Sequence, residues 1–388
     1  MIVRRIGLLA LFLTLLVPLL ITPGLQWPFI TGKAFFFRAM VCVAALASFA
    51  SPAPRNGRPL NALLTVLLPV SLIADIGAAD FRLALAGNLE RMDGFTGLLS
   101  LALYAMALSR LLVTPALRRG YLAGWCVVSL AVAAVSFFQV THITDRPWST
   151  LGNADYLGGY LALSALLAAH LAGRWRAWWG VFAIDVAALL TTNVLAPAVG
   201  LAAGLVVIGW RQNRRALVDV VAILPLLCAG AYQVDAVARS PWVDHVARKL
   251  AGSDLRPLIW TRTLDAIAMR PVLGWGHEGL TKAPTALVIE TGKPLDRAHN
   301  LVLDWLVEAG IIGLLAHTIV IRRMWQENEG QPWLLAMIAA WLALGMFSFD
   351  TLSVSMPIYA IIGLSEYRDV LGRTGVAADD QTHLGAGD

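Results

Sequence analysis

Apolar stretches long enough to cross a lipid bilayer recur along almost the whole of the 388-residue sequence. A transmembrane helix needs about 17 or more predominantly apolar residues in succession, and these stretches reach that length. Only 14% of the residues are charged, against roughly 25% in soluble proteins. The stretches are continuous and lack the alternation of transmembrane barrel strands. The sequence therefore predicts an all-α polytopic membrane protein.

The apolar stretches predict about twelve transmembrane helices. The seventh and eighth are joined by almost no linker, and the last two form a tight hairpin around Phe349 and Asp350. The expected spans lie near residues 6–23, 34–50, 60–77, 94–113, 121–140, 156–172, 176–192, 194–210, 216–233, 300–321, 332–348 and 351–366.

Arginines concentrate in alternate short loops, whereas the remaining short loops carry few cations. Because the cytoplasmic loops of membrane proteins are enriched in Lys and Arg, this bias predicts that both termini are cytoplasmic. The chain then divides into nine spans in residues 1–233, a large external loop in 234–298, three spans in 299–366 and a tail in 367–388. The loops that carry the bias contain Arg4, Arg5, Arg55, Arg58, Arg110, Arg118, Arg119, Arg174, Arg176, Arg211, Arg214, Arg215, Arg322 and Arg323.

The external loop contains two segments with helical amphipathicity. Residues Pro241–Leu250 carry an apolar stripe that is typical of a short helix on a membrane surface. Residues Leu258–Met269 predict a second amphipathic helix, which Arg270 and Pro271 end because proline cannot continue a helix. The glycines in Gly274–Gly276 then predict a turn.

The external loop is also rich in cations, for which two interpretations stay open. The cations could attract anionic lipid headgroups, or they could bind a diphosphate through guanidinium groups that stay charged at any pH. Arg256 is the main candidate, since it precedes Pro257 at the start of the second helix, where free backbone N–H groups attract anions. Arg262 and Arg297 are further candidates.

Polar residues precede two spans on the same external side. Glu90 and Arg91 are neighbours and could form a solvated ion pair. Alternatively, Arg91 could be a second residue that holds a phosphate. Asn153 either caps the sixth span or, together with Tyr156, hydrogen-bonds sugar hydroxyls.

His299 and Asn300 stand at the mouth of the tenth span. His299 fits either a satisfied interface histidine or a general base, because its ordinary pKa of about 6.5 suits the deprotonation of a hydroxyl at neutral pH. Asp296 or Asp304 would orient the base, and two nearby arginines would lower its pKa. On helical spacing His299 shares one face with Gly310, where a small residue would admit a neighbouring helix.

Nothing in the sequence predicts a cofactor. The cysteines Cys42, Cys126 and Cys228 lie far apart in apolar segments, and the histidines lack metal-ligand spacing. Phosphate-binding glycine motifs are absent. The net charge of +5 follows from the loop bias and implies no nucleic-acid partner.

Five separated stretches resemble one superfamily, that of the O-antigen ligases, polymerases and O-oligosaccharyltransferases, in the same order along the chain. The last two stretches are the most specific, and the resemblance spans roughly residues 85 to 365. The stretches are Glu90-Arg91 with Gly94, Gly152-Asn153 with Tyr156, Leu157 and Tyr160, Arg256–Trp260, Arg270–Gly276, and His299-Asn300 with Gly310 and Gly313.

The resemblance implies a GT-C-like fold and an inverting, metal-independent glycosyltransferase of the bacterial inner membrane. Such an enzyme moves a glycan from undecaprenyl diphosphate to lipid A-core or another acceptor at the periplasmic face, among membrane lipids. By motif, His299 would be the catalytic base, and Arg256 with Arg91 would hold the diphosphate. The candidates for glycan or acceptor binding are Asn153, Tyr156, Trp275 and Asn300. We expect a monomer.

One stretch departs from the superfamily pattern. Many relatives carry an arginine between the seventh and eighth spans, whereas this chain reads Thr191–Ala196 there, without a cation. Either Arg262 or Arg297 compensates, or the diphosphate is held differently.

Three alternative functions remain. A polysaccharide polymerase and a protein O-oligosaccharyltransferase belong to the same superfamily, and sequence motifs separate them poorly from a ligase. A transporter of lipid-linked glycans is disfavoured, because polar residues gather at one external interface and no internal repeat is apparent.

Overall fold

The computed structural model describes residues 2–50, 57–212, 255–286, 288 and 295–365, and every regular element within them is a helix. The α-helices are α1 Ile2–Leu13, α2 Thr31–Ser48, α3 Arg58–Ala62, α4 Leu68–Ile76, α5 Phe81–Ala86, α6 Phe95–Leu111, α7 Pro115–His142, α8 Ala154–Ala172, α9 Trp178–Thr191, α10 Leu195–Gln212, α14 Arg256–Met269, α15 Leu301–Glu327, α16 Pro332–Gly345 and α17 Leu352–Leu364. The helical turns η1 Thr14–Leu19, η2 Leu63–Leu67 and η3 Gly279–Lys282 complete the set.

Five helices in the described part of the chain are long and apolar enough to cross a membrane: Ile2–Leu19, Thr31–Ser48, Arg58–Ile76, Pro115–His142 and Leu301–Glu327. Shorter apolar helices correspond to further predicted spans at Phe95–Leu111, Trp178–Thr191, Leu195–Arg211, Pro332–Gly345 and Leu352–Leu364. These helices confirm a polytopic all-α membrane protein. The predicted span 216–233, the predicted surface helix Pro241–Leu250 and the tail 367–388 lie outside the described residues.

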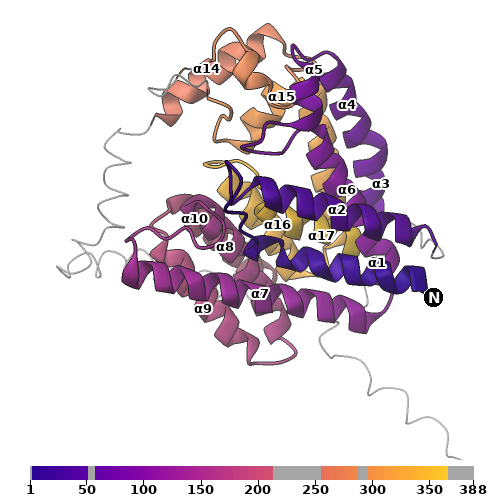
Figure 1. Cartoon of the computed structure of the whole chain (residues 1–388), viewed down its shortest axis with the longest axis vertical. Coiled ribbons are helices and arrows are strands. Elements are labelled where there is room, and N and C mark those ends of the chain that lie inside the picture. Colours follow the sequence, from indigo (N-terminus) through magenta and orange to yellow (C-terminus); the bar gives the residue numbers. More distant parts are fainter. Residues whose placement is uncertain (1, 51–56, 213–254, 287, 289–294, 366–388) are drawn as a thin grey trace, which may run out of the picture.

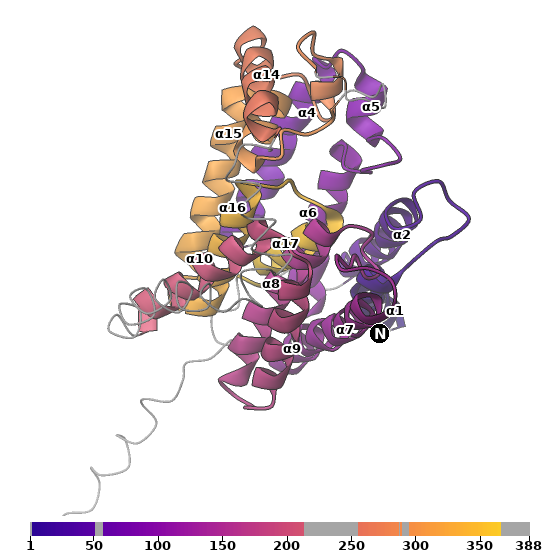
Figure 2. The same cartoon turned by 90° about the vertical axis from the view of Figure 1, so that its left-hand side faces the viewer.

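The spanning helices form two crossing groups. Figures 1 and 2 show α1, α2 and α7 side by side, running across the long axis that α4 and α15 follow. One main core of apolar side chains joins both groups, and α8 lies deep within it, with almost all of its residues buried. Figure 1 shows α14 and α5 at one end of the molecule, near the first turns of α15.

The second predicted loop helix is confirmed as α14, which ends at Met269, immediately before Arg270 and Pro271. A small apolar cluster lies beneath it, formed by Ala266, Trp275, Leu280, Ala283 and Val307. This cluster ties α14 and the following loop to α15.

Helix α15 is interrupted at Gly310, where φ is 64° and ψ is −164°. The loop after α14 pairs with the backbone on both sides of this break: the N–H of Trp275 donates to Val307 O at 2.8 Å, and the N–H of Ile311 donates to Pro271 O at 2.9 Å. A Cβ at Gly310 would stand 2.3 Å from the carbonyl carbon of Val272. The prediction that a neighbouring helix approaches Gly310 is therefore wrong, since the close neighbour is the turn that follows α14.

The placement of His299 on a helical face is also wrong. Helix α15 begins at Leu301 with Asn300 as its N-cap, and His299 precedes the cap with a positive φ of 54°. The histidine is therefore held by loop backbone beside the helix end. Helical periodicity therefore does not predict the direction in which the His299 side chain points.

Candidate active site

Arg91 lies in the loop between α5 and α6 and is fixed by a carboxylate from the far side of the chain. Its Nε and Nη2 donate to the two oxygens of Asp296 at 2.6 and 3.2 Å, and its Nη1 donates to the Tyr156 hydroxyl at 2.5 Å. Burial alone would lower the pKa of Arg91, but the Asp296 bond and the nearby oxygens raise it above its ordinary value. Of the two interpretations of Arg91, the solvated pair with Glu90 is thus wrong.

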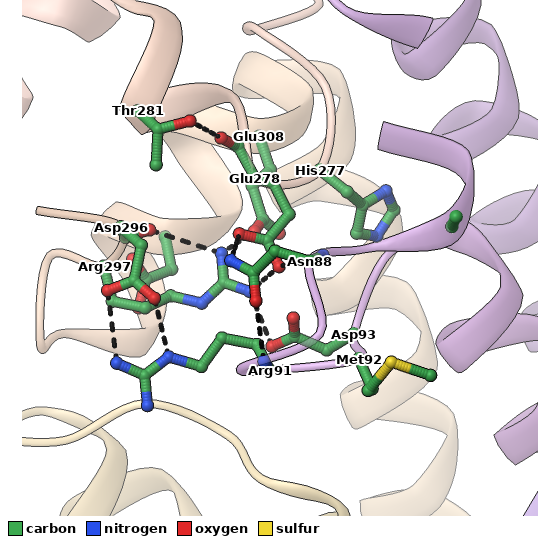
Figure 3. A network of polar contacts seen from close by, with 12 residues as sticks. Asn88, Arg91, Met92, Asp93, His277, Glu278, Thr281, Asp296, Arg297 and Glu308 are labelled. Atoms are coloured by element: carbon green, nitrogen blue, oxygen red, sulfur yellow. Dashed lines mark hydrogen bonds and ion pairs between the residues drawn. The ribbon is translucent and has the colours of Figure 1, made fainter. Parts of the chain in front are cut away.

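Arg297 is the centre of a buried cluster of acidic side chains (Figure 3). Its side chain is 4% exposed, and its guanidinium meets Asp93 at 2.5 Å, Glu308 at 2.8 Å and Glu278 at 3.5 Å. Burial opposes the charge, but the surrounding carboxylates raise the pKa of Arg297 well above its ordinary value. The guanidinium is thereby occupied by protein carboxylates.

Two carboxyls of this cluster have pKa values shifted in opposite directions. Burial raises the pKa of Glu278 to about 8, and the neighbouring Asp93 adds to this rise against the charge of Arg297. Burial would also raise the pKa of Asp93, but Arg297 and a hydrogen bond with Glu278 outweigh it and lower the pKa. Glu278 therefore carries a proton near neutral pH, while Asp93 is ionised. Asn88 donates its side-chain amide to Glu278 at 2.8 Å.

His299 packs edge to face on Phe349, with their ring centroids 5.0 Å apart. Phe349 lies between α16 and α17, and the same ring carries the Arg91 guanidinium 4.7 Å from its centroid. Burial lowers the pKa of His299 first, and the charges of Arg256 and Arg91 lower it further, against smaller effects of Asp155 and Asp296. The imidazole is therefore neutral at pH 7, in the direction expected from the sequence.

The two carboxylates expected to orient His299 make other contacts. Asp296 binds Arg91, and Asp304 accepts the backbone N–H of Ala298 at 2.7 Å. Among the described residues, neither carboxylate hydrogen-bonds the imidazole ring. The backbone on either side, rather than a carboxylate on the ring, holds His299.

The two arginines of α14 differ in their surroundings. Arg256 is half-buried at the first position of the helix and close enough to His299 to lower the pKa of that histidine. Arg262 is exposed on the same helix and pairs with Asp265 at 3.6 Å. The structure thus brings Arg256 to the histidine and leaves Arg262 at the surface.

All four candidate glycan-binding residues have a polar side-chain atom that is hydrogen-bonded within the protein, and for Tyr156 this is the hydroxyl bound to Arg91. Asn153 caps α8 by accepting the N–H of Asp155 at 2.8 Å. Asn300 caps α15 and donates to Met346 O at 3.1 Å. Trp275 is buried and donates its indole N–H to Ala266 O at 2.8 Å.

Tyr156, the fourth candidate, lines a cavity of about 160 Å³ together with Arg91 and Phe349. The cavity runs between α2, α6, α15 and α17, and its walls are mostly apolar, with Lys33 and Arg38 among the polar residues. The cavity therefore extends from Arg91 into the interior of the helix bundle.

Sequence reasoning missed the carboxyls that bind Arg297. Asp93, Glu278 and Glu308 are far apart in sequence, and each reads alone as an ordinary charged residue. The one available signal was that Glu278 lies two positions after the Gly274–Gly276 turn, which ends one of the two most specific stretches. Sequence reasoning also missed Phe349, which touches both His299 and Arg91.

Comparison with known proteins gives two matches. Residues 154–318 match a protein family described as O-antigen ligase, a range that includes Arg256 and His299 but not Arg91. An O-antigen ligase of Pseudomonas aeruginosa is 28% identical over 211 residues, which cover 49% of this chain and 49% of that protein. The matched part thus spans about half the length of this curated relative. Together the family match and the relative support membership of the O-antigen ligase superfamily, through the part of the chain that they match.

Proposed function

We propose that this protein transfers a glycan from undecaprenyl diphosphate to lipid A-core at the periplasmic face of the bacterial inner membrane. The observation that carries the proposal is a neutral histidine, His299, beside two arginines, Arg91 and Arg256, that lower its pKa. A neutral imidazole accepts a proton, and guanidinium groups hold phosphate oxygens. Membership of the superfamily supports a ligase-like glycosyltransferase activity.

In the proposed reaction His299 removes the proton of an acceptor hydroxyl. The hydroxyl oxygen then forms a bond to the anomeric carbon of the donor glycan, on the face opposite the diphosphate. The bond from that carbon to the diphosphate oxygen breaks, and undecaprenyl diphosphate leaves with the electron pair. The configuration at the anomeric carbon is inverted, and the proton on His299 passes to water.

Arg256 and Arg91 are proposed to stabilise the charge that develops on the leaving diphosphate. Preorganised cations of this kind act without reorganising during the reaction. Asp296 fixes the plane of the Arg91 guanidinium, and the N-terminus of α14 places backbone N–H groups near Arg256. Arg297 is instead a counter-ion for carboxylates, and Arg262 is too exposed to contribute strongly. The reaction is proposed to need no metal ion, because these arginines supply the positive charge.

The test is reconstitution with purified protein, a lipid-diphosphate-linked glycan and lipid A-core, in EDTA and without ATP. Wild type should glycosylate lipid A, whereas His299→Ala and Arg256→Ala should lose nearly all transfer while remaining folded. Arg262→Ala is the matched control on the same helix and should retain transfer. Glycan transfer by His299→Ala would show that His299 is not the base. Longer lipid-linked chains with untouched lipid A would identify a polymerase.

A further inference from the structure

Ala298, the residue immediately before His299, is held through both of its backbone polar groups by side chains from two different helices. The N–H of Ala298 donates to Asp304 Oδ1 at 2.7 Å, and the carbonyl oxygen of Ala298 accepts the indole N–H of Trp260 at 3.0 Å. Ala298 is fully buried. The bond to Asp304 is buried and the bond from Trp260 is partly buried, so both meet less competition from water than surface hydrogen bonds, which strengthens them.

The residue after His299 is held as well. The Asn300 side chain accepts the N–H groups of Val302 and Leu303, each at 3.1 Å, and donates to Met346 O. His299 itself, between these two fixed residues, has a φ of 54°. That left-handed conformation is uncommon outside glycine and persists where the surrounding contacts impose it.

Trp260 connects this restraint to the candidate diphosphate arginine. Arg256 and Trp260 are four residues apart on α14, so they lie on the same face of the helix. The Trp260 hydrogen bond therefore fixes the distance between the helix that carries Arg256 and the backbone that carries His299.

We propose that Trp260 and Asp304 are positioning residues. They hold His299 in its left-handed backbone conformation and at a fixed distance from the helix that carries Arg256. The consequence for catalysis rests on the proposed function, in which His299 is the base. In this proposal Trp260 and Asp304 act on His299 indirectly, through the backbone of Ala298. A base held in one orientation needs no reorganisation before each proton transfer, and small displacements of a base are costly.

The experiment compares Trp260→Phe, Asp304→Leu and Asp304→Asn in the full-length protein. Trp260→Phe keeps an aromatic ring but removes the N–H, and Asp304→Leu removes the acceptor. Each should lower kcat for glycan transfer about three- to tenfold, the value of one hydrogen bond. The KM for the donor should stay close to wild type because Arg91 and Arg256 remain. Asp304→Asn keeps a side-chain oxygen for the Ala298 N–H and should restore kcat.

A second measurement reports the conformation of His299 without catalysis. Diethyl pyrocarbonate modifies neutral imidazole, and mass spectrometry of the peptide containing His299 gives the rate at that residue. Trp260→Phe and Asp304→Leu should raise this rate about three- to tenfold, because His299 is no longer confined against Phe349. The control is Trp125→Phe, which removes an indole hydrogen bond to Ser164 within the helix core and should leave kcat and the labelling rate of His299 unchanged.

Wild-type kcat and labelling in Trp260→Phe would overturn the role of Trp260. Equal losses in Asp304→Asn and Asp304→Leu would overturn the role of Asp304 as an acceptor. If His299→Ala retained transfer while Trp260→Phe still changed the labelling of His299, the base assignment would fail and the restraint would stand. The experiment thus distinguishes a failure of the proposed function from a failure of the proposed restraint on His299.

Discussion

Arg91 and Asp296 join through two hydrogen bonds although they are 205 positions apart in sequence. Both side chains are largely buried, with 16% and 17% of their surfaces exposed. A guanidinium held in this way keeps one orientation, whereas a lysine ammonium in its place would be a point charge on a flexible stem. The pair therefore fixes which edge of the Arg91 side chain faces Tyr156.

We expect Arg91→Lys to lower kcat/KM for the lipid-linked donor about tenfold or more, although the positive charge is kept. Steady-state transfer assays check this. A double-mutant cycle of Arg91→Ala and Asp296→Ala measures the interaction energy of the pair from the free energies of unfolding in detergent. We expect a coupling of about 1–3 kcal/mol. Strictly additive effects would show that the pair contributes nothing beyond its separate contacts.

Removal of the Arg256 charge should move the acid limb of the pH–rate profile. The proposed base, His299, works when neutral, so we expect transfer to be lost as the pH falls through its pKa, which lies below the ordinary value. Without the Arg256 charge the protonated imidazole is less disfavoured, and the pKa of His299 rises. Arg256→Gln should therefore shift the acid limb to higher pH, whereas Arg256→Lys, which retains the charge, should not. A shift in both variants would mean that the charge is not the cause.

Glu278 should make stability fall as the pH rises from mildly acidic to mildly basic. Its pKa is raised to about 8 in the folded chain, so between pH values near 4.5 and 8 the folded state binds more protons than the unfolded state. Unfolding in detergent should thus become easier across this range. Glu278→Gln imitates the protonated acid and should flatten the dependence. An unchanged pH profile in this variant would assign the effect to other groups.

Gly310→Ala should destabilise the junction between α15 and the loop after α14. The positive φ with an extended ψ at Gly310 is a conformation that costs an alanine about 1–3 kcal/mol, and the new Cβ would also stand 2.3 Å from Val272. We expect a lower midpoint of thermal unfolding and a loss of transfer. Gly180→Ala on α9 is the control, because a Cβ there meets no atom within 4 Å. Equal stability of the two variants would contradict the close packing at Gly310.

Periodicity and hydropathy predict most of this fold because each span is a local property of the sequence. The helix after Arg256 was found in the same way, from its apolar stripe and the proline that follows it. The residues around the site were predicted less well. Asn153, Asn300 and Trp275 each have a polar side-chain atom bonded to the backbone. Of these bonds, only the helix cap at Asn153 was among the interpretations made from the sequence.

Contacts between distant segments could not be predicted from a single sequence. The contacts of Arg297 with Asp93 and Glu278 join segments that are far apart in sequence, and no local pattern links them. Gly310 was identified correctly as a position of close approach, but a glycine in sequence does not tell whether a helix or a loop approaches it. Phe349 was marked as part of a hairpin, and its contacts with His299 and Arg91 depend on how that hairpin packs.

The break at Gly310 also turns the first part of α15 into a spacer of fixed length and phase. Nine residues separate Asn300 from Gly310, and the rise of a helix makes this separation roughly 15 Å. One end is bound to the loop after α14, and the other carries His299. Deletion of one residue between them would rotate His299 by about 100° relative to that loop. This segment should therefore tolerate substitutions of similar size far better than any change in its number of residues.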